Sequence, residues 1–444
     1  MSAPDTPVLA PSSTLLRRLG KNLAWIFSSQ AGISVLGLVS LGLTARSLGP
    51  AALGYLAMIE AYTRLLSRLL HLEPWQATVF YGTQALEQGD SGRFGRLMTL
   101  SLWADLAGGL LAGGVAILLA AVAAPWMGMP PGDGALMLAV ASAAQILALR
   151  PTGIGALRIY DRFDVLAVTD AATALLRMAL IALAWLAGAG LWTFVLILVL
   201  VTLADGLLPM AMALREMRRH GHRLERVRPR GALAENPGFL HLLWNSNANV
   251  ILRQMTQRLD IILLSPMLPA AAIGFYQLAR RIGEAALRIG RPFSQVVYPE
   301  LTRMAVRNQM RKLGRFVLSV TAGLVVLEVV VVSAVIMNLP VILVTVFGPG
   351  FADAVPVVTI QAIAVALYLA GMMFGPAMLA IGLARDLSRV TLLTTIIFFA
   401  ILLPMTKALG IEGAAATHLV TNAIWLTLCG WLTLRRIARL RAGG

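Results

Sequence analysis

Residues 46–58 read RSLGPAALGYLAM, and this short stretch interrupts an otherwise apolar part of the sequence. The apolar segment at residues 23–45 precedes it, and apolar residues resume directly after it. Pro50 lacks a backbone N–H and cannot continue a helix without losing a hydrogen bond, while Gly49 and Gly54 permit backbone conformations that other residues avoid. The stretch therefore predicts a tight turn between two helices.

The composition is that of a membrane protein. Of the 444 residues, 58% are hydrophobic and 13% are charged, and the mean hydropathy is +0.78, outside the usual range of soluble proteins. Apolar runs of roughly 20 residues recur, which is the length that a helix needs to cross a bilayer. The first run is too long for the core of a signal peptide, so we expect it to remain as a helix. The single Cys429 excludes an internal disulfide framework.

The apolar runs, separated by polar or Gly/Pro residues, predict an all-α polytopic membrane protein with about twelve transmembrane helices. The predicted spans are residues 22–46, 52–71, 98–124, 134–152, 164–187, 191–213, 243–264, 271–295, 315–338, 355–380, 389–406 and 411–434. The second and eighth spans are polar enough that a hydropathy window alone could miss them.

The positive residues predict the orientation of these helices. The formal net charge is +16, and most Lys and Arg residues fall in alternate loops, which by the positive-inside rule face the cytoplasm. The opposite loops have no Lys or Arg around Pro130, Gly188, Pro269 and Gly350; the exceptions on that side are Arg46 and Lys407. We therefore expect a multi-pass protein of the bacterial inner membrane with both termini in the cytoplasm. The topology explains the charge without nucleic acid as a partner.

The turn at residue 50 has a second copy. Residues 267–279 read MLPAAAIGFYQLA, in which Pro269 matches Pro50 and Gly274 matches Gly54 with one residue inserted. Each copy joins the first two helices of a six-helix half. We expect an N-terminal half at residues 22–213, a basic cytoplasmic linker at 214–242, a C-terminal half at 243–434, and cytoplasmic tails at 1–21 and 435–444. Each half crosses the membrane six times, and because this number is even, both halves enter the membrane with the same orientation. We therefore expect a parallel repeat about an axis along the membrane normal, as in transporters.

Several stretches resemble one family. They are TARSLGPAALGYLA at residues 44–57, SPMLPAAAIGFYQLARRI at 265–282, YPELTRM at 298–304 and VFGPGFADAVPVV at 346–358. They are similar to the polysaccharide and O-antigen (Wzx-type) flippases of the multidrug/oligosaccharidyl-lipid/polysaccharide (MOP) exporter superfamily, whose layout covers nearly the whole chain. The resemblance implies a MATE-like fold. It also implies a cationic cavity between the halves that receives a polyprenyl-diphosphate-linked oligosaccharide for the synthesis of O-antigen, capsule or exopolysaccharide.

Charged residues inside the predicted helices are concentrated on the second, seventh and eighth spans. A charge at the bilayer centre costs at least about 2.5–3.5 kcal/mol, so these side chains should face the protein interior or a watery cavity. The candidate substrate-binding residues are Arg64, Arg68, Arg253, Arg258, Arg280, Arg281 and Arg288. The candidates for ion coupling or charge pairing are Glu60, Asp260 and Glu284.

The arginines outnumber the carboxylates in this set, and the excess favours an anionic ligand. Arginine donates two parallel hydrogen bonds to a phosphate and stays ionised at physiological pH, so a diphosphate fits both the charge and the geometry. Arg68, Arg291 and His71 lie near the cytoplasmic ends and could instead reach the lipid headgroups. The scattered Asp105, Asp170, Arg177, Asp205 and Glu328 are expected to make structural hydrogen bonds between helices.

The motifs favour a transporter over an enzyme. The sequence contains no GxxxxGK[ST] phosphate loop, no His/Cys metal cluster and no GxSxG turn, so we expect no cofactor and no ATP hydrolysis. We expect alternating access driven by a substrate gradient, a membrane potential or an ion gradient. The expected partners are the lipid-linked oligosaccharide and membrane lipids, with a polysaccharide polymerase or other glycan assembly proteins as further candidates.

Four other functions remain open on the sequence. A cation-coupled multidrug exporter shares the superfamily, although the cationic helices disfavour it. A peptidoglycan lipid precursor flippase is chemically similar, but its relatives commonly have fourteen helices. A membrane polymerase or ligase would need a substantial outer loop, and the predicted outer loops are short. A non-transporting scaffold would leave the intramembrane arginines without a purpose. The stretch RRHGHRLERVRPR at residues 218–230 could bind anionic headgroups or an enzyme, or serve topology alone.

Overall fold

The computed structural model describes the backbone of residues 12–442 and the side chains of these residues except 12–31, 33, 248–258, 289–296 and 442. All regular elements in this part of the chain are helices. They are α1 (Ser12–Leu70), α2 (Trp75–Glu87), α3 (Ser91–Trp126), α4 (Asp133–Ala143), η1 (Ala144–Leu147), α5 (Arg150–Ile159), α6 (Phe163–Leu186), α7 (Leu191–Arg219), α8 (Pro229–Glu235), α9 (Phe239–Leu264), α10 (Ala270–Val306), α11 (Met310–Phe347), η2 (Pro349–Ala354), α12 (Val355–Ala370), α13 (Phe374–Ala380) and α14 (Ala384–Ala442).

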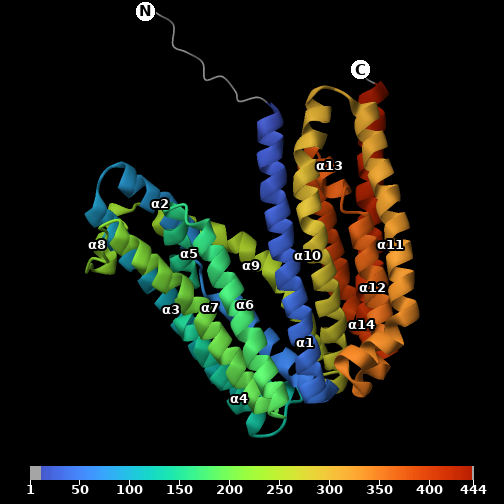
Figure 1. Ribbon diagram of the computed structural model, residues 1–444, viewed down its shortest axis with the longest axis horizontal. Coiled ribbons are helices and arrows are strands. Elements are labelled where there is room, and N and C mark those ends of the chain that lie inside the picture. The colour runs from blue at the N-terminus through green and yellow to red at the C-terminus, as the bar shows by residue number, and fades with distance from the viewer. Residues whose placement is uncertain (1–11, 443–444) are drawn as a thin grey trace, which may run out of the picture.

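The stretch at residue 50 is a kink between two limbs of α1. Gly49 has φ +71° and ψ 178°, a backbone conformation that favours glycine, and Pro50 follows it as the first residue of the second limb. The first limb begins at the same end of the molecule where α14 ends, and α2, which follows the second limb, lies near that end too (Figure 1). The chain therefore reverses at Gly49. A second reversal, at Gly410 with φ +61°, divides α14 in the same way.

The predicted all-α fold with about twelve crossings is confirmed. By length and apolarity, eight stretches of the described chain could span a membrane, and two of them, Ser34–Leu70 and Ala384–Arg441, include the reversals in α1 and α14. α9 and α10 are not among the eight, although both are long enough to cross. For α10 the reason is the polarity that the sequence predicted for the eighth span.

The helices form two bundles that meet at one end of the molecule and separate toward the other (Figure 1). We call the two ends the Pro50 end and the basic end, the latter carrying the start of α1, the end of α14 and the Arg-rich segments at 215–230 and 303–315. One hydrophobic core at the Pro50 end contains residues of both halves, such as Met58, Tyr276 and Phe347. Near the basic end the cores are separate: one lies within the C-terminal half, and two lie within the N-terminal half and the start of α9. Apolar burial therefore joins the halves at the Pro50 end.

The two repeated glycines meet at this junction, where α1 packs along α10. A Cβ atom on Gly54 would lie 1.8 Å from the carbonyl oxygen of Ala270, and one on Gly274 would lie 2.1 Å from the carbonyl oxygen of Pro50. Real Cβ contacts are never this short, so each glycine lets the backbone of the other half approach. The sequence repeat thus has a direct structural role.

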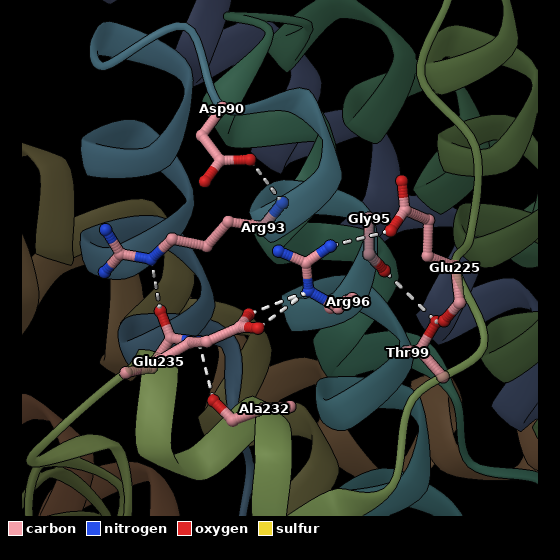
Figure 2. Close-up of polar contacts among 9 residues, drawn as sticks. Asp90, Arg93, Gly95, Arg96, Thr99, Glu225, Ala232 and Glu235 are labelled. Atoms are coloured by element: carbon pink, nitrogen blue, oxygen red, sulfur yellow. Dashed lines mark hydrogen bonds and ion pairs between the residues drawn. The ribbon is translucent and has the colours of Figure 1, made fainter.

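The linker between α7 and α9 is held against the N-terminal half, chiefly by α3 (Figure 2). Arg96 donates to Glu235 at 2.8 Å and to Glu225 at 2.9 Å, and Thr99 donates to the carbonyl oxygen of Glu225 at 2.8 Å. A Cβ on Gly95 would lie 2.4 Å from the carbonyl oxygen of Arg223, so the linker passes directly over that glycine. The linker is therefore a packed part of the N-terminal half.

Candidate functional site

A cavity lies between both limbs of α1, the η1–α5 segment, α6, α7 and one face of α10. Its volume is about 720 Å³, which lies within the range that ligand pockets commonly have. Apolar side chains such as Leu53, Leu56 and Phe194 line it together with a concentrated set of charges. The cavity is formed mainly by the N-terminal half, and α10 is the part of the C-terminal half that faces it among the described residues.

Glu60 and Arg281 join the two halves inside this cavity. Arg281 of α10 donates to the carboxylate of Glu60 on α1, and Arg64 lies 3.6 Å from the same carboxylate, one helical turn further along α1. Glu60 is ten residues beyond Pro50, which places it about 15 Å along the helix, near the middle of a hydrocarbon core about 30 Å thick. A charge network therefore sits at mid-membrane depth between the halves.

Arg68 and Arg288 line the cavity closer to the basic end. Arg68 is ion-paired with Glu73, in the loop after α1. The backbone N–H of Glu73 in turn donates to the Oδ1 atom of Asn247 on α9, at 2.9 Å. The start of α9, the first helix of the C-terminal half, is thereby attached to the N-terminal half beside the cavity.

The opposite wall carries charges that the sequence interpretation left out of the site. Arg150 donates to Asp205 at 2.6 Å and to Asp170 at 2.7 Å, and these residues line the cavity together with Arg177. The sequence analysis expects structural hydrogen bonds for Asp170, Arg177 and Asp205, and Arg150 is not among its candidate site residues. A signal was present, because Pro151 after Arg150 predicts a new helix start, and a helix interrupted inside a membrane commonly lines a cavity.

The charges of the cavity do not balance. Among the described residues, six arginines line it, namely Arg64, Arg68, Arg150, Arg177, Arg281 and Arg288. The four carboxylates that line it are Glu60, Glu73, Asp170 and Asp205. Six positive and four negative formal charges leave a net charge of +2. The cavity is therefore suited to a ligand with about two negative charges.

Three of the predicted site residues lie in a second charge network of the C-terminal half, outside the cavity lining. Tyr276 donates to Asp260 at 2.8 Å, and Arg280 lies 3.4 Å from Asp260 and 3.9 Å from Glu284. His418 of α14 lies 2.8 Å from the hydroxyl of Tyr276. Arg280, Asp260 and Glu284 do not line the cavity. Arg253 and Arg258 fall outside the residues whose side chains the structure describes.

Asp105 has a structural environment, as the sequence predicted. It is fully buried, accepts the backbone N–H of Thr152 at 2.9 Å and lies 3.3 Å from Nε2 of His71. This carboxylate caps the start of α5 and thus fixes the position of Arg150. Within the described residues, no group of three or more His, Cys, Asp or Glu side chains could hold a metal ion.

Residues 19–305 match the family described as "Polysaccharide biosynthesis protein". The "Inner membrane protein YghQ" of Escherichia coli (strain K12) is 27% identical over 350 residues, which cover 76% of this chain and 95% of that protein.

Solved structures show the same fold. A multidrug resistance MATE family transporter of the MOP superfamily, in an inward-facing conformation, aligns with a TM-score of 0.69 at 15% identity, covering 94% of this chain and 95% of the other. The lipid II flippase MurJ, in an inward closed conformation, aligns with a TM-score of 0.67 at 12% identity, covering 93% and 89%. The fold is that of the MOP superfamily, and these neighbours are transporters and flippases rather than enzymes.

Proposed function

Because this chain belongs to the polysaccharide biosynthesis protein family, we propose that it is a flippase for a polyprenyl-diphosphate-linked oligosaccharide. It moves this lipid from the cytoplasmic to the outer leaflet of the bacterial inner membrane, for the synthesis of a surface polysaccharide such as O-antigen, capsule or exopolysaccharide. The names of two relatives, an inner membrane protein and a lipid II flippase, support the location and the type of substrate.

The net charge of the cavity carries this proposal. A diphosphate that links a lipid to a sugar has two ionisable oxygens and hence about two negative charges at neutral pH, equal and opposite to the +2 of the cavity lining. Arg64 and Arg281 lie at mid-membrane depth, where an unpaired charge is most costly and a bound anion gains most from pairing. A cationic drug would meet a cavity of its own sign, which disfavours a multidrug exporter.

The geometry supports alternating access between the halves at residues 22–213 and 243–434. The basic end faces the cytoplasm by the positive-inside rule, so the halves are separate on the cytoplasmic side and joined on the outer side. Rocking about the central charge network would close the basic end and open the Pro50 end. The polar head group would cross through the cavity while the polyprenyl tail stays in the bilayer.

The test uses a strain that lacks this protein and is complemented with variants. We expect Arg64→Ala, Arg281→Ala and Arg288→Ala each to reduce flipping by about 10–100-fold, because each removes a charged hydrogen-bond donor worth roughly 1.5–3 kcal/mol. Mass spectrometry of the polyprenyl-diphosphate fraction should show a completed, unpolymerised oligosaccharide accumulating, with loss of surface polysaccharide.

The matched control is Arg303→Ala, which removes an exposed arginine paired with Glu300 at the basic end, outside the cavity. Like the unmodified protein, this variant should return the polyprenyl-diphosphate lipid pool of the deletion strain to normal. Membrane insertion and amount are checked by immunoblot for each variant. A normal lipid pool in the deletion strain, together with new sensitivity to cationic drugs, would reject the proposal and favour a multidrug exporter.

A further inference from the structure

The two walls of the cavity differ in charge. Among the described residues, the wall formed by α1, the loop after it and α10 has four arginines (Arg64, Arg68, Arg281 and Arg288) and two carboxylates (Glu60 and Glu73). On the wall formed by α5, α6 and α7, two arginines (Arg150 and Arg177) face two carboxylates (Asp170 and Asp205). The entire net charge of +2 therefore lies on the α1–α10 wall. The α5–α7 wall is neutral but rich in polar groups, so it offers no net attraction to a second anion.

The carboxylates of the neutral wall have free accepting capacity. Asp170 and Asp205 each bind Arg150 through their Oδ1 atoms, and their side chains are 43% and 46% exposed. In the described part of the chain, their Oδ2 atoms have no hydrogen-bond partner. Arg150 thus fixes the orientation of two carboxylates whose second oxygens can accept hydrogen bonds from a ligand in the cavity.

Gln277 is an independent sign of a ligand. It lines the same cavity on α10, one turn before Arg281, and its side chain is only 4% exposed. Its Oε1 atom has no hydrogen-bond partner, which is costly for a buried polar group. The terminal amide torsion is soft, so either end of the amide can turn toward a ligand. A donor brought by the ligand would satisfy this oxygen.

The two walls face each other closely enough to hold one ligand. Arg177 on α6 and Asp205 on α7 line the same cavity of about 720 Å³ as Glu60, Arg64 and Arg281 of the charged wall. A head group whose diphosphate binds the charged wall therefore has its attached group beside Asp205 and Arg177. The wall beside this attached group offers hydrogen-bond acceptors and has no net charge. A group that fits there therefore carries many hydrogen-bond donors and no net charge, as the hydroxyl groups of sugars do.

We propose that Asp170, Asp205 and Gln277 form a glycan subsite that binds the hydroxyl groups of the sugars next to the diphosphate. The subsite rests on the proposed function, because it supposes that the diphosphate occupies the arginines of the α1–α10 wall, opposite Asp170 and Asp205 and further along α10 than Gln277. Its role is to distinguish a glycosylated lipid from the bare lipid carrier, which must not be moved in place of the substrate. Asp170 and Asp205 are specificity-determining residues in this arrangement.

The experiment compares two probes in nanodiscs that contain the full-length protein. One probe is polyprenyl diphosphate without sugar, and the other is the polyprenyl-diphosphate oligosaccharide purified from cells lacking the protein. The unmodified protein should bind the glycosylated probe at least tenfold more tightly. Asp205→Asn, Asp170→Asn and Gln277→Leu should each weaken binding of the glycosylated probe about tenfold, which corresponds to about 1.4 kcal/mol, and leave binding of the bare probe unchanged.

Gln277→Leu keeps the test valid if an Asp variant folds poorly, because the Oε1 of Gln277 makes no internal hydrogen bond that the variant could lose. Asp386→Asn is the matched control, since it neutralises a carboxylate paired with Arg389 outside the cavity. Equal binding of the two probes by the unmodified protein would overturn the subsite and leave the diphosphate proposal standing. The same conclusion would follow if the variants weakened the binding of both probes equally. Failure of both probes to bind would overturn the proposed function and the subsite with it.

Discussion

Single residues decide how the helices around the cavity are fixed. Asp105 accepts a backbone N–H at the start of α5 and lies beside His71 of the loop after α1, so one carboxylate connects three separate segments. Such a residue is recognisable in the sequence as a charge inside an apolar run, which indicates an internal partner. Its partners are not recognisable, because Thr152 is 47 residues away in the chain. The same limit applies to Arg150, whose two carboxylate partners are 20 and 55 residues away.

We predict that Asp105→Ala destabilises the protein. The substitution leaves the buried N–H of Thr152 and the ring of His71 without their acceptor, and each unsatisfied group costs about 1–3 kcal/mol. Thermal unfolding in detergent, followed by light scattering or by size-exclusion recovery, should show a clearly lower midpoint. Asp133→Ala is the matched control, because it removes an exposed acidic residue from the first turn of α4 and should change stability by less than about 0.5 kcal/mol. An unchanged midpoint in Asp105→Ala would contradict the capping role.

At the scale of elements, the linker between α7 and α9 shows how side-chain contacts hold a basic segment in place. A basic segment between two halves is usually a solvated connection, yet this one packs on α3 and the end of α5. The hydroxyl of Tyr160 lies 2.7 Å from Nδ1 of His222, and Phe94 contacts the His222 ring edge-on. Burial raises the pKa of the Tyr160 hydroxyl, so it stays protonated and can donate. Burial, together with the nearby His220, lowers the pKa of the His222 imidazole.

We predict that the linker loosens in acid. Because the pKa of His222 is lower when the linker is docked, the undocked linker takes up a proton first, and docking weakens as the pH falls below about 6.5. The hydrogen–deuterium exchange rate of residues 220–238 is divided, at each pH, by the intrinsic exchange rate of an unstructured chain. This ratio should be higher at pH 5.5 than at pH 7.5. His222→Phe keeps an aromatic ring but cannot titrate, so it should reduce this difference. A pH effect of equal size in the variant would assign the titration to His220 or another group.

At the scale of the whole molecule, the distribution of apolar cores decides which side is closed. The shared core at the Pro50 end holds residues of both halves, whereas the cores near the basic end remain separate. Opening the Pro50 end must therefore separate apolar surface from apolar surface, which costs free energy in proportion to the exposed area. In the proposed mechanism, closure of the basic end and binding of the substrate would offset this cost.

We predict that a cross-link at the Pro50 end blocks transport. A Cβ atom on Gly42 of α1 would lie 3.3 Å from Cγ1 of Val346 on α11, and a cysteine sulfur at residue 346 can occupy a similar position, as a disulfide requires. The pair Gly42→Cys with Val346→Cys, in a Cys429→Ala background without other cysteines, should stop flipping when oxidised and regain it after reduction. Gly42→Cys alone is the control. Full transport by the oxidised, cross-linked protein would reject an outward opening at this end.

The sequence by itself determined the features that depend on neighbouring residues. Apolar run length predicted the crossings, Gly49 and Pro50 predicted the reversal, and the repeat predicted that residues 54 and 274 hold equivalent places, because each of these follows from local backbone chemistry or from chain periodicity. The concentration of charges inside three predicted helices also selected Glu60, Arg64 and Arg281, because a charge at the bilayer centre has to face the protein interior or a watery cavity.

Only the tertiary structure decided which charges face one another. It placed Arg281 against Glu60 and Arg280 in a second charge network, although the two arginines are adjacent in the chain, because consecutive helical residues point in directions about 100° apart. It also brought Arg150, Asp170 and Asp205 together from three elements. Pairing across helices depends on packing angles that no local pattern contains, and for that reason the neutral wall of the cavity could not be predicted from the sequence.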